Sequence, residues 1–510
     1  MNRLAHKTVA IAAAATISIA GPVGASMSVA HAQGADQPAA PAAAAPININ
    51  APTTLTIAKQ EGEPGNASAA KAGFTFRAEK IQTAPLNTAE GWNNVRDIIA
   101  GGAENAPVDP TFTAVEKTTG ADGTAVFDEL GVGLFRITEL RNGNYTVARP
   151  FLVTLPLTEQ GAYNYNPTIS PKNQLLEPTK EAEDTGVTVG KNIHYTIEAP
   201  VPVAEQTREG TNTLTKFTIT DNLPAELNYD SNAAVKVGNV GADGTFTEVA
   251  NDLQAGTDYT LTAESKRVQV VFTESGLQKL QALRQNNPGL NVQLAFDAKV
   301  VQLPANGRIE NTAQIGTPNS DTDIDTKPKN PNEGEGPKVT QFANVEITKT
   351  VSGGDENATG NGAQFQVFKC TQDDGKWKVQ GESLPFTNQA GTEALTDKNI
   401  TAENGTTADN AKATGYGFQA DQEAEYCAVE TKAPNGFVAN PDPFHLTKNV
   451  PAEDRQATDR IVFTGKIDNV KDNVWGNLPA TGERTMLILL GLGALLFAGG
   501  AAYQLNRRNA

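Results

Sequence analysis

The sequence predicts an all-β chain built from three tandem immunoglobulin-like β-sandwich modules. From Thr53 onward, short runs of β-branched and aromatic residues alternate with clusters of turn residues, which is the pattern expected of strands. The 510 residues suffice for three domains of roughly 150 residues each. The 46 glycines and 29 prolines suit many short strands joined by turns better than the interior of an α/β enzyme. Together, this pattern and this length favour β-sandwich domains arranged in series along the chain.

Changes in composition divide the chain into segments. A stretch rich in Pro, Gly and Glu has the composition of a linker and precedes the last module. A short helical pattern interrupts the strands of the first module, and another interrupts those of the second. The expected segments are a first module at 53–173 with a helix at 93–100, a second module at 174–325 with a helix at 275–285, a linker at 326–338 and a third module at 339–475.

Composition also excludes several classes of function. The chain has 41 Lys and Arg against 58 Asp and Glu, a net charge of −17, so a basic surface for nucleic acid is not expected. With 2 cysteines and 4 histidines, it cannot build a four-cysteine zinc site and has little from which to build a histidine-based centre. We therefore expect no metal, no cofactor, no nucleic-acid partner and no enzymatic turnover.

The N-terminus is expected to direct secretion rather than to join the fold. Arg3 and Lys7 precede an apolar run that ends in Ala-His-Ala at positions 30–32. A basic start, an apolar middle and an A-x-A site define a secretory signal peptide, predicted here over 1–32. The Ala/Pro-rich segment 33–52 that follows is expected to be disordered.

The C-terminus carries a pentapeptide, an apolar span and a basic tail, in that order. Residues 486–503 would extend roughly 27 Å as a helix, close to the thickness of a bilayer core. Arg507 and Arg508 in the tail 504–510 favour a cytoplasmic end. An ordinary single-span anchor, with the pentapeptide a chance loop, is the alternative interpretation.

The order of these parts resembles the cell-wall sorting signal of Gram-positive surface proteins, which sortase recognises. The resemblance implies that a sortase cysteine attacks the carbonyl of Thr481 and cleaves the chain before Gly482. The membrane span would then hold the chain only until this cleavage. The sorting motif at 478–482 consists of Leu478, Pro479, Ala480, Thr481 and Gly482.

The third module contains the segment 426–437, which reads Y-C-A-V-E-T-K-A-P-N-G-F. It resembles the E-box of sortase-assembled pilins, Y-x-L-x-E-T-x-A-P-x-G-Y, with two mild departures. In CnaB-type domains of that family, a Lys on the first strand and an Asn on the last strand join in an isopeptide bond that the E-box Glu promotes. The resemblance assigns these roles to Lys349, Asn469 and Glu430, with Glu430 as the proton donor.

The chemistry that the E-box implies is physically coherent. Burial disfavours a charged ammonium and leaves the lysine as a neutral nucleophile. A buried glutamic acid that keeps its proton can polarise the amide carbonyl. Holding the two groups in contact then replaces a slow amide exchange by a single intramolecular turnover. The alternative is that Glu430 and Lys349 are ordinary surface charges.

The second module lacks an E-box but has a Lys, an Asp and an Asn in the order found in CnaA-type middle domains. The resemblance implies a bond between Lys180 and Asn311, with Asp221 as the buried acid and proton donor. An Asp before a turn is common without any such role. Lys172 and Lys191 lie nearby in the sequence and are the alternative candidates for this lysine.

The first module ends in T-I-S-P-K-N at 168–173, which resembles the pilin motif W-x3-V-x-V-Y-P-K-N of corynebacterial and actinomycete shaft pilins. The Pro-Lys-Asn core is intact and several flanking positions differ. The resemblance makes Lys172 the nucleophile that resolves the acyl-enzyme on Thr481 of another subunit. Lys59 and Glu139 could contribute to an internal bond in this module, but no acceptor Asn stands out, so none is predicted there.

Cys370 and Cys427 both fall in the third module. A secreted chain with two cysteines in one domain usually pairs them, so a disulfide is predicted. Two buried free thiols are the alternative.

Taken together, these motifs resemble the sortase-assembled major shaft pilins of Gram-positive bacteria, with CnaB-, CnaA- and CnaB-type modules in that order. The resemblance implies a structural subunit of a cell-wall-anchored fimbria that supports adhesion. Its partners would be a pilin-specific sortase, a housekeeping sortase, identical subunits in a head-to-tail polymer, minor pilins and peptidoglycan. A wall-anchored monomeric adhesin, or a minor base or tip pilin, is the alternative.

Overall fold

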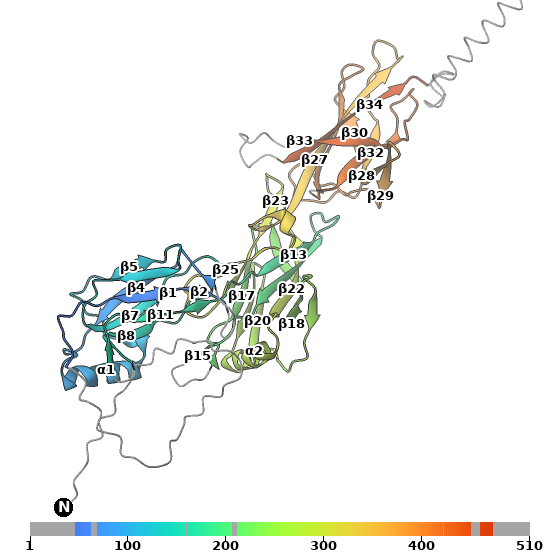
Figure 1. Ribbon diagram of the computed structural model, residues 1–510. Helices are drawn as coiled ribbons and strands as arrows, with labels where there is room; N and C mark the ends of the chain where they lie inside the picture. Colours follow the sequence, from blue (N-terminus) through green and yellow to red (C-terminus); the bar gives the residue numbers. More distant parts are fainter. Residues whose placement is uncertain are drawn as a thin grey trace, which may run out of the picture.

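The computed structural model describes residues 46–472, with gaps at 63–68, 160–161, 207–211, 422 and 450–459. Three β-rich bodies follow one another along the chain, coloured blue, green and orange in Figure 1. The predicted all-β class with immunoglobulin-like modules is confirmed. In the part of the chain that the structure describes, no helix is long and apolar enough to cross a membrane. The predicted signal peptide, sorting motif, membrane span and basic tail lie outside the described residues.

The first module is made of short strands over two small apolar cores. Leu55 and Ile57 alternate with half-buried threonine and alanine on β1, as expected for a strand with one face on the core. The first and last strands of this module are neighbours, because β1 pairs in parallel with β11, and β2 in parallel with β12. The elements are β1 (Leu55–Ala58), β2 (Gln60–Glu61), β3 (Ala69–Ala70), β4 (Thr75–Ile81), α1 (Ala89–Gly101), η1 (Ala103–Asn105), β5 (Val115–Thr118), β6 (Thr124–Phe127), β7 (Gly133–Glu139), β8 (Phe151–Leu155), β9 (Leu157–Glu159), β10 (Ala162–Asn164), β11 (Thr168–Ile169) and β12 (Lys172–Asn173).

The second module packs a six-stranded sheet against a five-stranded sheet. Strand β14 pairs with β22 over its whole length, and inward side chains such as Ile197 and Phe296 fill the space between the sheets. The elements are β13 (Thr179–Glu183), β14 (Asn192–Pro200), β15 (Glu205–Gln206), β16 (Asn212–Thr213), β17 (Thr218–Asn222), β18 (Leu227–Val240), β19 (Phe246–Glu248), β20 (Tyr259–Glu264), β21 (Arg267–Phe272), α2 (Glu274–Asn286), β22 (Leu290–Val300), β23 (Arg308–Asn311), β24 (Ala313–Gly316), β25 (Ile324–Asp325), β26 (Lys327–Pro328) and η2 (Pro331–Glu333).

Both helices form where the sequence predicts helical patterns, and both begin at a threonine cap. The side chain of Thr88 accepts a hydrogen bond from the Gly91 amide at the start of α1. Thr273 accepts one from the Gly276 amide at the start of α2. A threonine oxygen satisfies an amide that would otherwise lack a partner in the first turn, which fixes where each helix begins.

The third module closes its sheet on itself. Strand β27 pairs antiparallel with β31 on one side and parallel with β34 on the other. The first and last strands of this module are therefore direct neighbours along ten residue pairs. The elements are β27 (Lys338–Ser352), β28 (Gln364–Asp373), β29 (Lys376–Gln380), β30 (Ile400–Glu403), β31 (Ala411–Gln419), β32 (Glu425–Lys432), β33 (Phe444–Asn449) and β34 (Ile461–Val470).

Strand β27 joins the second and third modules without an intervening coil. Its first residues pair with β23 of the second module, with Lys338 opposite Asn311. Phe342 lies in the apolar core of the second module, whereas the next residue, Ala343, lies in the core of the third. The Thr340 hydroxyl also donates a hydrogen bond to Asp184 across the junction (2.6 Å). One continuous strand therefore serves both cores.

Two segments expected to lack structure are packed. At the end of the Ala/Pro-rich stretch, Ile47 is buried in a core of the first module, and the Asn48 amide donates to the Tyr165 hydroxyl (2.9 Å). Within 326–338, the short strand β26 pairs with β13. Residues 46–52 thus differ from the expected disorder, because Ile47 provides a large apolar anchor at the end of the Ala/Pro-rich segment.

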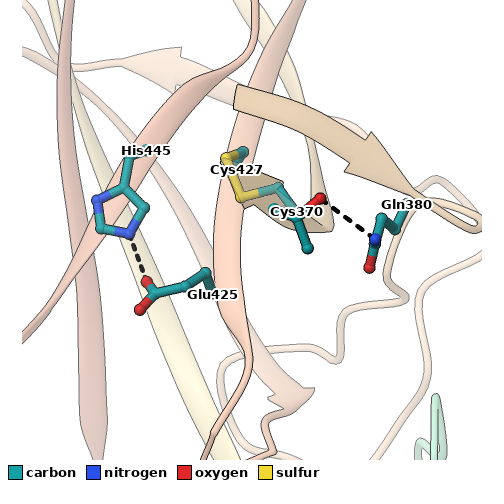
Figure 2. Close-up of a disulfide and its surroundings, with 6 residues drawn as sticks. Cys370, Gln380, Glu425, Cys427 and His445 are labelled. Atoms are coloured by element: carbon teal, nitrogen blue, oxygen red, sulfur yellow. Dashed lines mark hydrogen bonds and ion pairs between the residues drawn. A yellow bond between two sulfur atoms is a disulfide. The ribbon is translucent and has the colours of Figure 1, made fainter. Parts of the chain in front are cut away.

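The predicted disulfide is confirmed: Cys370 on β28 is bonded to Cys427 on β32 (Figure 2). The bond connects two strands that already pair with each other, and it closes a loop of 57 residues. On the neighbouring strand, His445 Nε2 lies 2.6 Å from Glu425 Oε2, and the His445 ring stacks on Trp377. The disulfide thus fixes one sheet region of the third module.

We expect reduction of this disulfide, or the pair C370S and C427S, to destabilise the third module. Loop-closure entropy for this separation predicts a loss of about 4 kcal/mol in its free energy of unfolding. Calorimetry of the full chain checks this, since the transition of the third module should move to lower temperature while the other transitions stay in place. An unchanged transition would contradict the prediction.

Candidate functional site

The third module brings Lys349, Glu430 and Asn469 into one buried site. Lys349 lies on the first strand β27, Asn469 on the last strand β34 and Glu430 on β32. In the parallel pairing of β27 with β34, Asn469 faces Val351, two residues beyond Lys349. Residues two apart on a strand share a face, so Lys349 and Asn469 point to the same side. All three side chains are at most 3% exposed.

Hydrogen bonds orient the amide and the carboxyl group of this site. The Asn469 Nδ2 donates to Glu430 Oε2 (2.7 Å) and also to the carbonyl of Val438. The Asn440 amide donates to the same Glu430 oxygen (2.7 Å). The amide plane of Asn469 is therefore held with its nitrogen toward Glu430. Among the described residues, its Oδ1 has no hydrogen-bond partner.

Burial shifts the lysine of this site toward its neutral form. Burial lowers the pKa of Lys349 to about 8, although Glu430 and Asp468 oppose the change. Its Nζ donates to the backbone carbonyls of Thr350 (2.5 Å) and Ile467 (3.2 Å). A lysine with this pKa has a much larger neutral fraction at pH 7 than an exposed one.

The second module brings together Lys180, Asp221 and Asn311. Lys180 lies on the first strand β13, and its Nζ is hydrogen-bonded to Asp221 on β17. Asp221 faces Ala313 on β24, two residues beyond Asn311, and this pairing carries Asn311 to the acid. The three side chains are at most 1% exposed, whereas the rival Lys191 is exposed.

Burial dominates the electrostatics of this second site. It lowers the pKa of Lys180 and raises the pKa of Asp221, against the mutual attraction of the two groups. The Asn311 amide also acts on Asp221, in the direction that lowers its pKa. Lys180 Nζ lies 4.7 Å from the centre of the Tyr195 ring, so an aromatic ring packs against the amine. In this low-dielectric setting, burial works against the charged form of both groups.

The first module contains a third constellation, which sequence reasoning left incomplete. Lys59 and Glu139 are buried 3.2 Å apart, and the side chain that completes the group is Asn173. The Asn173 Nδ2 donates to Glu139 Oε1 (2.9 Å). Asn173 was overlooked because the sequence shows it only as the last residue of the Pro-Lys-Asn motif. The signal that could have found it is its place on the module's last strand.

Lys172 lies on β12 directly before Asn173, opposite Gln60 of β2. Because side chains alternate along a strand, Lys172 points to the face opposite Asn173 and is half-buried, not enclosed. Thr481 and the other sorting-motif residues lie outside the described part of the chain, so the structure does not bear on that end of the predicted linkage.

The fold and these sites define a class of protein. The chain is an extended series of all-β modules, each with a buried lysine, acid and asparagine where strands from the two ends of the module meet. Across the described ranges, no group of His, Cys, Asp and Glu side chains is arranged to hold a metal ion. The features are those of a modular structural protein.

The comparisons with known proteins agree with that class. Two curated relatives are 30% identical: fimbrial subunit type 1 of Actinomyces viscosus and fimbrial subunit type 2 of Actinomyces naeslundii, each match covering 91% of this chain and 92% of the relative. No family model matches. Among solved structures, the major pilin SpaD of Corynebacterium diphtheriae matches 84% of this chain and 99% of its own, with a TM-score of 0.54 and 22% identity. The major pilin SpaA of the same organism covers 82% of this chain and 100% of its own, with a TM-score of 0.54 and 21% identity.

The chain therefore belongs to the family of fimbrial subunits. It is a structural component of cell-surface fimbriae and not an enzyme. The two solved structures share its fold.

Replacing the acid of the third module should stop its proposed chemistry. Glu430→Gln keeps the size of the side chain but removes the acid, so we expect the Lys349–Asn469 bond to be absent and the chain to retain one more ammonia. By loop-closure entropy, the module should lose about 5 kcal/mol of its free energy of unfolding. Intact mass and calorimetry measure the two effects.

Glu425→Gln is the matched control, because Glu425 begins the same strand but is exposed and pairs with His445. It should leave both the mass loss and the module's unfolding transition as in the wild type. An E430Q chain with an intact bond would contradict the role of Glu430.

Bond formation in the third module should depend on pH through Lys349. The amine reacts only when neutral, and its pKa is about 8, so the rate should rise as pH increases from 6 through 8 and level off above. With an unshifted lysine, the rise would continue beyond pH 10. The measurement is a time course of the crosslinked peptide after refolding the full chain from denaturant at each pH. A rate that keeps rising tenfold per pH unit above pH 9 would contradict a lowered pKa.

Proposed function

We propose that this chain is the shaft subunit of a covalent fimbria, polymerised by a pilin-specific sortase through Thr481 of one subunit and Lys172 of the next. The observation that carries the proposal is the place of Lys172. It ends the first module on a strand anchored to β2, beside the buried constellation, and is more than 300 residues before the sorting motif. An amine near one end and an acyl donor at the other are what a head-to-tail polymer needs.

The linkage step balances without any cofactor. The sortase cysteine attacks the Thr481 carbonyl and the Thr481–Gly482 bond breaks, leaving a thioester and releasing the span. The Lys172 amine then attacks the thioester carbonyl, an amide forms, and the cysteine leaves with the proton. We assign attachment of the last subunit to peptidoglycan to a housekeeping sortase, and place minor pilins in the same polymer.

The internal bonds proposed for the second and third modules follow one scheme. The neutral lysine Nζ attacks the asparagine Cγ, the Cγ–Nδ2 bond breaks and ammonia leaves, with the acid passing a proton from the amine to the leaving group. Lys180 would be joined to Asn311 beside Asp221, and Lys349 to Asn469 beside Glu430. Support comes from their burial, the lowered pKa of both lysines and the contacts described above.

These bonds would change how the fibre carries tension. Tension between Lys172 and Thr481 passes through the second and third modules in turn. A bond between two residues of a module gives the force a covalent route past every strand between them. Residues 181–310 of the second module and 350–468 of the third would then be shielded from the load, whereas β24, β25 and β26 follow Asn311 and stay in the loaded path. Reducing agents do not cleave an amide.

The test is polymerisation in cells that display the protein. Lys172→Arg keeps the positive charge but removes the primary amine, so the high-molecular-weight ladder on denaturing gels should disappear, leaving monomer. In wild-type fibres, digestion should yield a branched peptide that joins Thr481 to Lys172.

Lys191→Arg is the matched control, an exposed lysine of the neighbouring module, and it should leave the ladder intact. A ladder that persists in K172R would overturn the proposed linkage. A wild-type protein found only as wall-anchored monomer, or only at fibre ends, would favour an adhesin or a minor pilin instead.

A further inference from the structure

The first module encloses three reactive side chains that its sequence does not reveal as a set. Lys59 follows β1, Glu139 ends β7 and Asn173 ends β12. Their exposed fractions are 1%, 4% and 2%. Lys59 Nζ lies 3.2 Å from Glu139 Oε1 and 4.9 Å from the centre of the Phe74 ring. An amine, a carboxyl group and an amide are therefore buried together in the first module.

The strand register at this site is that of the third module. In the first module, β2 and β12 are parallel, and Asn173 faces Glu61, two residues beyond Lys59. In the third module, β27 and β34 are parallel, and Asn469 faces Val351, two residues beyond Lys349. In both modules, the strand that follows or carries the lysine lies directly beside the strand that carries the asparagine.

The hydrogen bonds match as well. Asn173 Nδ2 donates to the Glu139 carboxylate and to the Thr146 carbonyl, and the Ala148 amide donates to the same carboxylate (2.9 Å). Around Glu430 the corresponding donors and acceptors are Asn469 Nδ2, the Val438 carbonyl and the Asn440 amide. In each site, the backbone acceptor and the backbone donor are two residues apart. The two sites share one construction although their sequences differ.

We propose that Lys59 and Asn173 are joined by a self-formed isopeptide bond in the first module, a third internal crosslink of this chain. The neutral Lys59 Nζ attacks Asn173 Cγ, and the Nζ–Cγ bond forms as the Cγ–Nδ2 bond breaks. The proton lost by Nζ passes through Glu139 to the departing nitrogen, which leaves as ammonia. No oxidant, reductant or added reactant is needed.

The state of the unreacted groups favours this step. Burial lowers the pKa of Lys59 to about 8, against the attraction of Glu139. The carbonyl oxygen of Asn173 has no hydrogen-bond partner within the described ranges. Its Nδ2 is held by two acceptors, which orients the amide, and one of them is the Glu139 oxygen that lies 3.2 Å from Lys59 Nζ. Holding the reacting groups in this way supplies most of what an amide exchange lacks in water.

The crosslink would fix the strand that presents Lys172. Strand β12 is only two residues long and is held to β2 by a short parallel pairing. A covalent bond from Asn173 to Lys59 closes the module directly beside the linking lysine. This consequence rests on the proposed role of Lys172 in the fimbria, whereas the crosslink itself does not.

The test is peptide mapping of the full chain purified from cells without sortase activity. We expect a branched peptide joining Lys59 to Asn173, and an intact mass lower by three ammonias for the three modules, besides the two hydrogens of the disulfide. In Asn173→Ala this branched peptide should vanish while the Lys180–Asn311 and Lys349–Asn469 peptides persist. Glu139→Gln should likewise remove only the first of the three.

Asn166→Ala is the matched control, because Asn166 is an exposed asparagine of the same module, and it should keep all three crosslinks. Unmodified Lys59 and Asn173 peptides from the folded wild-type chain would overturn the inference even if both other crosslinks and the Lys172 polymer are found. Because the wild-type chain is measured directly, a variant that fails to fold does not affect that outcome.

Discussion

The structure depends on burying a lysine amine whose nearby carboxyl group does not fully offset the cost of its charge. Charging a buried amine costs more than a single nearby carboxylate returns, so the amine tends to lose its proton. Each module meets this constraint in the same place, where strands from its two ends lie beside each other. The parallel pairing of β27 with β34, and of β2 with β12, creates that place in two of the modules. In the chemistry proposed above, such a buried amine would react once an asparagine amide shares its site.

Much of this could be predicted from the sequence, because long motifs report local geometry. The E-box identifies Glu430, and the flanking strands then offer few choices for Lys349 and Asn469. In the second module the order of Lys, Asp and Asn predicts Lys180, Asp221 and Asn311 but leaves Lys172 and Lys191 as alternatives, and the structure brings the first three together. The all-β class follows from alternation and turns, and the disulfide from two cysteines in one secreted module.

Asn173 was missed for a physical reason. A two-residue strand carries no periodic signal, and the pairing that brings Asn173 to Lys59 joins segments more than 100 residues apart. The adjacent Lys172 accounts for the Pro-Lys-Asn motif by itself, so the motif indicates no separate role for its asparagine. The continuity of β27 across two cores was hidden similarly, since the Pro-, Gly- and Glu-rich residues before it have the composition of a flexible linker. Local composition does not show that the following strand pairs with β23.

The three sites differ in whether tension along the proposed fibre would pass through them. In the proposed fibre, force enters at Lys172 and leaves at Thr481, so it crosses the second and third modules, while residues 46–171 lie outside the loaded segment. The proposed bonds Lys180–Asn311 and Lys349–Asn469 lie on that route and shorten it. A bond between Lys59 and Asn173 does not, because Lys59 is on the unloaded side. Its effect falls on the anchorage of β12, where the loaded chain leaves the first module. The same chemistry would thus carry load in the second and third modules and anchor β12 in the first. The position of Lys172 in the chain decides which of the two purposes each bond serves.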